Sequence, residues 1–238
     1  MRGNIPADDK ERGMKSFEEL KVMRKVKGGE HVTVCAFGAS NTQRYQPGMH
    51  WFDCVELGFK SAYGGDCGAF LNAGVSGNTA QNLIDRFERD VARFRPDLTI
   101  VTIGGNDFVP ETFRKNLLHL HDLLTGIGSE VLFQTYYACD LEKMNPPDRV
   151  PTMMRIVREV AAMTSSVLND NDARWAPLRD SNLSLYRTLM RDPMHVNTDG
   201  NLLIGADLMR RFGFRVPVED PAFRTAAAFQ YILDLLER

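Results

Sequence analysis

The sequence predicts an α/β protein in which a parallel sheet is covered by helices on both faces. Short runs rich in β-branched residues alternate with longer segments whose apolar residues recur at helical spacing. Polar turns that contain glycine follow three of the short runs, as expected where a strand leads into a helix. The 238 residues, of which 43% are hydrophobic, suffice for one sizeable core, so we expect one main domain.

The strands of this sheet are expected in five segments. The clearest is the run from Leu98 to Ile103, which is apolar and β-branched and leads into Gly104. The run near Ala69 to Asn72 is weaker, and the one around Arg174 to Leu178 is the least marked. In chain order, the expected strands are residues 32–37, 69–72, 98–103, 131–136 and about 174–178.

Apolar residues three or four positions apart predict the helices between these strands. Each set of such residues would form one buried stripe on a helix. The sets are Leu83, Phe87 and Val91; Phe113, Leu117, Leu120 and Leu124; Met154, Val157, Ala161 and Leu168; and a last core helix at residues 201–212.

The two ends of the chain are expected to form extensions of a central domain at residues 29–216. Residues 1–28 are mildly basic and are expected to be helical. Residues 217–238 are expected to begin a helix near Pro221, because proline is favoured at the first helical position. The apolar face of this helix would either pack on the core or join a second copy of the chain in a homo-oligomer; it carries Phe229, Ile232, Leu233 and Leu236.

The composition argues against nucleic-acid and membrane partners. The chain has 29 basic and 31 acidic residues, a formal charge of −2, which calls for no polyanionic partner. No segment approaches the roughly 18 consecutive apolar residues of a membrane span, and we expect a cytoplasmic protein. The cysteines form no C-x-x-C pair and are expected to be reduced thiols; they are Cys35, Cys54, Cys67 and Cys139.

Polar residues gather in the turns after the first three expected strands. These turns are Gly38-Ala39-Ser40, Asn72-Ala73-Gly74 and Gly104-Gly105-Asn106-Asp107. Since ligands of open parallel sheets bind outside the carboxyl ends of the strands, we expect the three turns to converge on one site. Each turn taken alone is more simply interpreted as a connection between a strand and a helix.

A fourth polar segment, Asp192-Pro193-Met194-His195, lies near the other end of the chain. An aspartate three residues before a histidine in a turn can reach the Nδ1 of the imidazole and orient it as a base. The pair by itself is a weak signal, because the aspartate could equally cap a turn.

In this order, the four segments resemble the sequence blocks of the SGNH hydrolases, the superfamily that contains GDSL lipases and esterases. The segment ending at Ser40 resembles the nucleophile block, Gly74 the glycine of the second block, Gly104 to Asp107 the G-x-N-D block, and Asp192 to His195 the D-x-x-H block. The resemblance covers about residues 31–212. It implies a flavodoxin-like three-layer α/β/α sandwich with a parallel five-stranded sheet, no cofactor, and ester or thioester hydrolysis by acyl transfer through serine.

The chemistry of these residues agrees with the resemblance. Ser40 would be the nucleophile, His195 its base and Asp192 the group that orients the base. The oxyanion formed on the carbonyl would accept hydrogen bonds from the backbone N–H groups of Ser40 and Gly74 and from the amide of Asn106.

The sequence departs from the family pattern in two places. The aspartate that usually precedes the nucleophile is replaced by Ala39, which changes the local support of the serine turn but removes no member of the triad. The loop from Gln43 to His50 matches no block, so substrate preference is the property that transfers least.

The sequence contains several alternative candidate sites. Ser76 also follows a glycine in a strand-to-helix turn, although Asn78 and Thr79 after it indicate a helix cap. His119, His121 and Asp122 could suggest a metal, but the two histidines would lie about 200° apart on a helix, so we expect no metal site. His50 could line the pocket or lie on the surface, and Tyr136 and Tyr137 could stack on a substrate or simply pack. No G-x-S-x-G motif occurs, which argues against an α/β-hydrolase.

The expected function is therefore a serine esterase whose small-molecule substrates are small acyl esters, with acetyl groups on carbohydrates as one candidate substrate. A lysophospholipase, an acyl-thioesterase or an acyltransferase fits the same residues. A non-catalytic binding protein on this fold is a further alternative that Ala39 raises and the complete triad disfavours.

Overall fold

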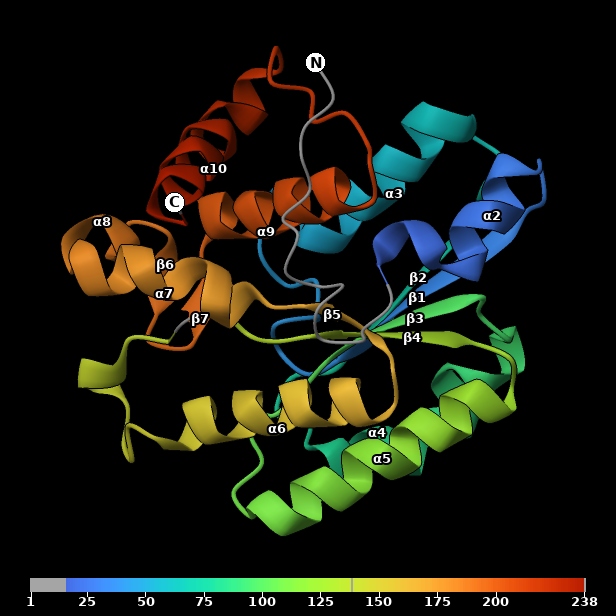
Figure 1. Cartoon of the computed structure of the whole chain (residues 1–238), viewed down its shortest axis with the longest axis horizontal. Coiled ribbons are helices and arrows are strands. Elements are labelled where there is room, and N and C mark those ends of the chain that lie inside the picture. Colours follow the sequence, from blue (N-terminus) through green and yellow to red (C-terminus); the bar gives the residue numbers. More distant parts are fainter. Residues whose placement is uncertain (1–15, 138, 238) are drawn as a thin grey trace.

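The computed structural model of the chain describes residues 16–137 and 139–237. Its central sheet has five parallel strands in the order β2-β1-β3-β4-β5, and helices cover both faces (Figure 1). The predicted three-layer α/β/α sandwich is confirmed. The strands are β1 (Val32–Gly38), β2 (Gly68–Gly74), β3 (Leu98–Thr102), β4 (Glu130–Gln134) and β5 (Val167–Asn169).

The strand order reverses at β1, which is the position where open α/β sheets bind ligands. β1 pairs with β2 on one side and with β3 on the other. Its last residue, Gly38, lies in register with Gly74 of β2 and Thr102 of β3. The turns that follow these three strands therefore leave the sheet at one edge and at one level.

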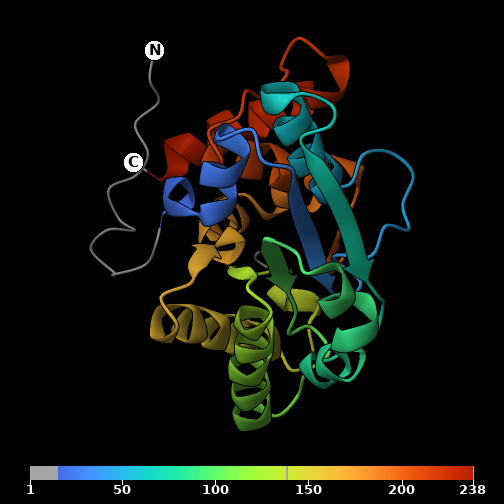
Figure 2. The same ribbon diagram turned by 90° about the vertical axis from the view of Figure 1, so that its right-hand side faces the viewer.

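Helices form a layer on each face of the sheet (Figures 1 and 2). The side chains of β1 alternate between the two cores: Val34 and Ala36 pack in one, Cys35 and Phe37 in the other, and all four are fully buried. The first core includes α2 (Lys21–Lys27), α3 (Trp51–Tyr63), α7 (Asn171–Ser181), α8 (Leu183–Arg187), α9 (Thr198–Arg211) and α10 (Arg224–Leu236). The second lies under α4 (Ala80–Asp90), α5 (Pro110–Gly126) and α6 (Arg149–Met163).

Short elements complete the chain. β6 (Met190–Asp192) and β7 (His195–Val196) pair as an antiparallel hairpin apart from the main sheet. The 3₁₀ turns are η1 (Phe17–Glu19), η2 (Ala92–Phe94), η3 (Leu141–Lys143) and η4 (Pro221–Phe223). No helix in the two described ranges is long and apolar enough to cross a membrane. All four cysteines are buried and free.

The fifth strand is not where the sequence pattern placed it. Residues 174–178 belong to α7, whose N-terminus is capped by Asp170, a side-chain acceptor for the Ala173 N–H. The strand is the short segment Val167–Asn169 instead. Its central residue, Leu168, had been assigned to the preceding helical stripe, but α6 ends at Met163 and the chain turns at Ser165 with φ 50°. Three residues are too few for a period to be recognised.

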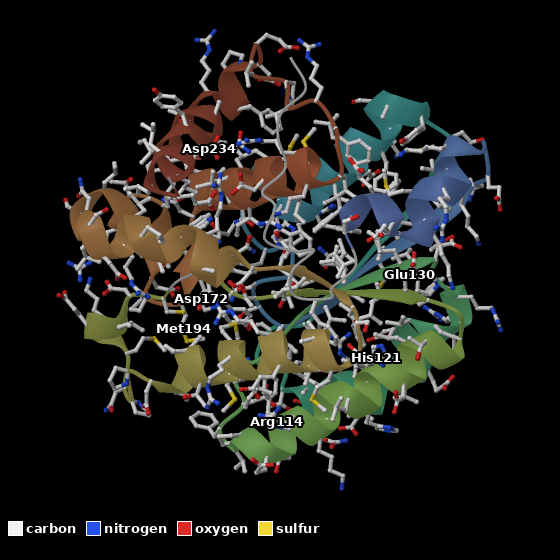
Figure 3. All side chains as sticks on the ribbon, viewed as in Figure 1. Arg114, His121, Glu130, Asp172, Met194 and Asp234 are labelled. Carbon is white, nitrogen blue, oxygen red and sulfur yellow. The ribbon has the colours of Figure 1, made fainter. Side chains whose placement is uncertain are left out.

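Both ends of the described chain pack on the domain. Glu130, at the start of β4, accepts hydrogen bonds from the backbone N–H groups of Lys21 and Val22, which holds the first turn of α2. In Figure 3, Glu130 lies on the side of the molecule opposite Met194 of the hairpin. Residues 1–15 of the predicted N-terminal extension lie outside the described residues.

The C-terminal helix α10 packs against α7 and α9. Phe229 and Leu233 are buried on its inner face, whereas Leu236, expected on that face, is 38% exposed. The contact contains a buried ion cluster centred on Arg174, which lies 3.3 Å from Asp207 and 2.7 Å from Asp234 (labelled in Figure 3). Only 9% of the Arg174 side chain and 7% of the Asp207 side chain are exposed.

Replacing Arg174 with methionine is expected to lower the free energy of unfolding by about 3–5 kcal/mol, because the Asp207 carboxylate would stay buried without its cation. Urea unfolding followed by circular dichroism measures the loss. Arg210→Met is the matched control: Arg210 also pairs with Asp234, but it is 46% exposed, so its loss should cost less than about 1 kcal/mol. Equal effects of the two substitutions would contradict a special role for the buried cluster.

Candidate functional site

The hairpin of β6 and β7 brings Asp192 and His195 together. The two residues pair across the hairpin, with Pro193 and Met194 as its turn. Nδ1 of His195 lies 2.8 Å and 2.9 Å from the two carboxylate oxygens of Asp192. The Met194 N–H donates to the same carboxylate at 2.9 Å, which holds the aspartate in the turn.

Ser40 lies directly after β1 and meets the other side of the imidazole. Its Oγ is 2.8 Å from Nε2 of His195, although the two residues are 155 positions apart in the chain. The structure thus joins the predicted nucleophile, base and orienting carboxylate in one line of hydrogen bonds. Such a line can transfer the hydroxyl proton to the imidazole while the carboxylate stabilises the resulting positive charge.

The carboxylate of Asp192 is held in its charged form. Burial acts to raise its pKa, but the hydrogen bonds from the Met194 N–H, the Arg191 guanidinium and His195 outweigh this effect, so the pKa lies below its usual value. Arg191 contributes a contact of 2.9 Å to Oδ2. Asp192 is therefore negatively charged at neutral pH, as an orienting group requires.

Ala39 fits the turn that carries Ser40. Its side chain is fully buried among apolar residues between the sheet and the helices α4 to α6. Its N–H donates to Thr102 of β3, and its carbonyl accepts from the N–H groups of Thr42 and Gln43. These backbone bonds support the turn without a side chain at position 39, so the aspartate that the family usually has here is not needed to shape it.

The second turn packs directly against the first. A Cβ on Gly74 would lie 2.3 Å from the Gln43 nitrogen and 2.4 Å from the Thr42 carbonyl carbon, so only glycine fits. The Gly74 N–H, predicted as an oxyanion donor, donates to the side-chain oxygen of Asn72 at 3.0 Å. A substrate oxygen would have to share this donor with Asn72 or displace it.

The third turn presents the amide of Asn106. Gly104 begins the turn with φ 119°, a conformation that favours glycine. Nδ2 of Asn106 donates to the Asn78 carbonyl at 3.0 Å, which leaves the second amide N–H for another acceptor. Asp107 accepts a hydrogen bond from Ala80 at the start of α4, and its burial raises its pKa to about 6.

One residue that the sequence did not single out ties the three turns together. The buried guanidinium of Arg86, on α4, donates to the carbonyls of Gly38 at 3.0 Å and Ala73 at 2.8 Å. It also donates to Oδ1 of Asn78 at 2.7 Å, and the carbonyl of Asn78 is the one that holds the Asn106 amide. Arg86 therefore contacts the backbone before Ser40, the peptide that carries the Gly74 N–H, and the residue that holds Asn106.

Tyr136 and Tyr137 do not form a stacking surface for a substrate. Both rings are buried, at 1% and 2% exposure. The Tyr136 hydroxyl accepts a hydrogen bond from the Gly105 N–H, and the Tyr137 hydroxyl accepts one from the Val196 N–H at 2.9 Å. The Tyr137 hydroxyl also donates to Oδ1 of Asn41 at 2.8 Å. The two tyrosines therefore hold the turns of the site from within the core.

His50 lines a small cavity beside Ser40, which is one of the two positions left open for it. Its Nδ1 accepts the Phe52 N–H at the start of α3, and burial lowers its pKa to about 4, so it is neutral at neutral pH. The cavity has a volume of about 10 Å³, and its other lining residues are Ser40, Asn41, Gln43, Tyr45, Gln46, Val196 and Asn201.

The alternative sites are not assembled in the structure. Ser76 lies in an exposed turn, where its N–H donates to Gln43, and the helix after it is capped by Thr79. His119 and His121 lie on α5. Within residues 16–137 and 139–237, no group of three potential metal-ligating side chains occurs.

Comparison with known proteins gives consistent results. A model described as the GDSL-like lipase/acylhydrolase family matches residues 36–203. A curated acetylxylan esterase from Geobacillus stearothermophilus is 27% identical over 164 residues, which cover 60% of this chain and 72% of that protein. The crystal structure of Axe2, an acetylxylan esterase from the same organism, has a TM-score of 0.66 at 21% identity and covers 77% of this chain and 95% of its own. The acetyl xylan esterase AlAXEase has a TM-score of 0.66 at 22% identity, with coverages of 76% and 98%.

Replacing Arg86 with methionine is expected to lower kcat for an acetyl ester by about 10–10²-fold, because small displacements of catalytic turns have effects of this size. KM should change little, since Arg86 does not face the cavity. Steady-state kinetics with p-nitrophenyl acetate measure both constants. Arg114→Met is the control, because Arg114 pairs with Glu159 between α5 and α6, away from the turns; a similar loss of kcat in this variant would contradict the positioning role of Arg86.

Proposed function

This chain belongs to the GDSL-like lipase/acylhydrolase family of SGNH hydrolases and is an ester-hydrolysing enzyme, and we propose that it removes acetyl groups from carbohydrates through Ser40, His195 and Asp192. The observation that carries this proposal is the line of hydrogen bonds from Ser40 Oγ through the imidazole to the Asp192 carboxylate. The nucleophile Ser40 is bonded to the base His195, and the base is bonded to the carboxylate that orients it.

In the first half of the reaction, Ser40 Oγ attacks the ester carbonyl carbon while Nε2 of His195 accepts the hydroxyl proton. The tetrahedral intermediate collapses to an acyl-enzyme when the bond to the alcohol oxygen breaks, and His195 returns the proton to that oxygen. In the second half, water attacks the acyl carbon while His195 accepts its proton. The second tetrahedral intermediate collapses when the bond to Ser40 Oγ breaks, and His195 returns the proton to Oγ, which releases acetate and restores the Ser40 hydroxyl. Asp192 stays ionised throughout and stabilises the imidazolium.

The negative charge on the carbonyl oxygen needs hydrogen-bond donors in both halves. Within the described residues, the Ser40 N–H has no acceptor and the Asn106 amide has one N–H to spare, so these two groups are the best placed. Gly74 is the third proposed donor, and a substrate oxygen would have to share its N–H with Asn72 or displace the Asn72 side chain.

The cavity beside Ser40 supports a short acyl group. Its volume is only about 10 Å³, room for about one water molecule, so an acyl group held here must be small and must extend into the open space around the cavity. Most of its lining residues are polar, including Gln43, Gln46 and His50. A long alkyl chain would leave these groups without hydrogen-bond partners, whereas an acetyl group is small enough to avoid that loss.

The carbohydrate alcohol is supported by the relatives. The curated protein that matches most of the family region is an acetylxylan esterase, and two solved structures with the same fold are also acetylxylan esterases. We therefore propose an acetylated polysaccharide or oligosaccharide, of the kind that carries acetyl esters on sugar hydroxyls, as the substrate.

Ser40 is expected to form the covalent intermediate. A fluorophosphonate probe should label the peptide that contains Ser40, as seen by mass spectrometry, and Ser40→Ala should lose on the order of 10⁴-fold or more in turnover. Release of acetate from acetylated xylo-oligosaccharides, compared with p-nitrophenyl esters from acetate to palmitate, measures the preference for short acyl groups. Ser76→Ala is the matched control and should keep full activity. A label on Ser76, or faster turnover of palmitate than of acetate, would overturn the proposal.

Asn106→Ala is expected to lower kcat by about 10²–10³-fold with little change in KM, because the amide interacts more strongly with the oxyanion than with the bound ester. Asn106→Asp keeps the size of the side chain but replaces the N–H donor with an acceptor, and it should be at least as inactive. Melting temperatures of both variants control for distortion of the turn. Near-normal turnover of the aspartate variant would rule out Asn106 as a donor.

A further inference from the structure

Phe108 is an exposed aromatic residue at the edge of the site. It follows Asn106 and Asp107 directly, and 70% of its surface is exposed, the largest value among the large hydrophobic side chains of residues 16–137 and 139–237. The next residue, Val109, is 58% exposed, so the two side chains form a contiguous apolar patch, and such patches can mark ligand-binding surfaces. This patch lies beside Asn106, a proposed oxyanion donor, so a ligand bound on it would be close to the reacting ester.

One face of the Phe108 ring is covered by Arg149, the first residue of α6. The centre of the guanidinium lies 4.6 Å from the ring centroid. Nη1 donates to the carbonyl of Gly105 at 2.6 Å, and Nη2 lies 3.7 Å from the sulfur of Met194, the neighbour of His195. Figure 3 shows Met194 near the beginning of α6. Arg149 therefore spans the space between the Asn106 turn and the hairpin that carries His195.

The guanidinium of Arg149 is not fully satisfied by the protein. Other arginines of similar or greater burial pair with carboxylates, namely Arg114, Arg158, Arg174, Arg179 and Arg187. Arg149 pairs with no carboxylate in the described part of the chain, and its buried Nε has no acceptor. Nη1 and Nη2 each carry two N–H groups and each has one contact with the protein, so one N–H of each is left for oxygen atoms of a bound ligand.

The alcohol half of the ester must lie on this side of Ser40. His195 delivers its proton to the leaving oxygen, so the alcohol lies next to the imidazole, and Met194 and Arg149 are the neighbours there. The cavity on the side of residues 43–50 is small, whereas Phe108 and Val109 are exposed to solvent. An oligosaccharide can occupy only an open region.

We propose that Phe108 and Arg149 form the binding subsite for the sugar residue that carries the acetyl ester. The apolar C–H face of a sugar ring would lie on the free face of Phe108, and Arg149 would donate hydrogen bonds to its hydroxyl oxygens. This inference rests on the proposed carbohydrate esterase function, and it identifies the part of the chain that distinguishes a sugar from a simple alcohol.

The test compares two acetyl esters that differ only in the alcohol. Phe108→Ala should raise KM for acetylated xylo-oligosaccharide by about tenfold, the loss expected when a stacked aromatic contact is removed. KM and kcat for ethyl acetate, which has no sugar ring, should stay within about twofold of wild type. Phe108→Trp should restore KM for the sugar ester, and Phe108→Leu, which is apolar but not planar, should not.

Phe94→Ala is the matched control. Phe94 is 41% exposed and carries the guanidinium of Arg93 at 4.5 Å, so it is a similar pair, but η2 precedes β3 and lies at the other end of the strands. It should leave both substrates unaffected. Calorimetric titration with deacetylated xylo-oligosaccharide measures binding without turnover when Ser40 is replaced by alanine. The heat of binding seen with Ser40→Ala should disappear in the double variant that also carries Phe108→Ala.

The outcomes separate the inference from the function on which it rests. If wild type hydrolyses the sugar ester and Phe108→Ala has the same KM, the subsite is wrong and the esterase proposal stands. An equal rise of KM for ethyl acetate would also overturn the subsite, because it would show a general disturbance of the Asn106 turn. If wild type hydrolyses ethyl acetate but no acetylated sugar, the carbohydrate function fails and the subsite fails with it.

Discussion

The arrangement of this site depends on the in-register pairing of β1 with its two neighbours. Backbone hydrogen bonds hold Gly38, Gly74 and Thr102 at one level, so three separate connections leave the sheet beside each other. The buried guanidinium of Arg86 then links the carbonyls of Gly38 and Ala73 to Asn78. Because a sheet and a buried cation are both rigid, Ser40 and the proposed oxyanion donors are held in place before any substrate binds, which is the condition for electrostatic stabilisation of a transition state.

Buried charged groups also lie at this edge of the sheet. Arg86 and Asp107 are both nearly fully buried there, and the raised pKa of Asp107, about 6, reflects the unfavourable desolvation of its charge. Each such group is bound to backbone N–H or C=O groups of the turns rather than left free. Burying these groups lowers the free energy of unfolding, because they lose their hydration. This loss accompanies any fixed polar site that is built on a hydrophobic sheet.

The site is asymmetric, and the asymmetry matches the two halves of an ester. On one side of Ser40 lies a small cavity lined largely by polar residues, with a neutral His50 at its wall. On the other side, Arg149 and the exposed Phe108 lie beyond His195 and Asn106. In the proposed reaction, the short acyl group lies toward the first side and the alcohol toward the second, where Phe108 is exposed to solvent. Tyr136 and Tyr137 support both sides from within the core, since their hydroxyls bind the backbone of Gly105 and Val196.

The sequence by itself determined the sheet, its first four strands and the residues Ser40, Asp192 and His195, because strong hydrophobic runs and short motifs are local signals. It did not locate β5, since three residues define no period, and it left open whether Tyr136 and Tyr137 stack on a substrate or pack in the core, where both are buried. The roles of Arg86 and Arg149 were decided by the tertiary structure alone. The sequence pattern of a helix does not show whether an arginine faces water or a distant carbonyl. Arg86 lies 48 positions from Gly38 in the chain, and Arg149 lies 44 positions from Gly105. Only the packing of α4 and α6 against the turns makes these two side chains part of the site.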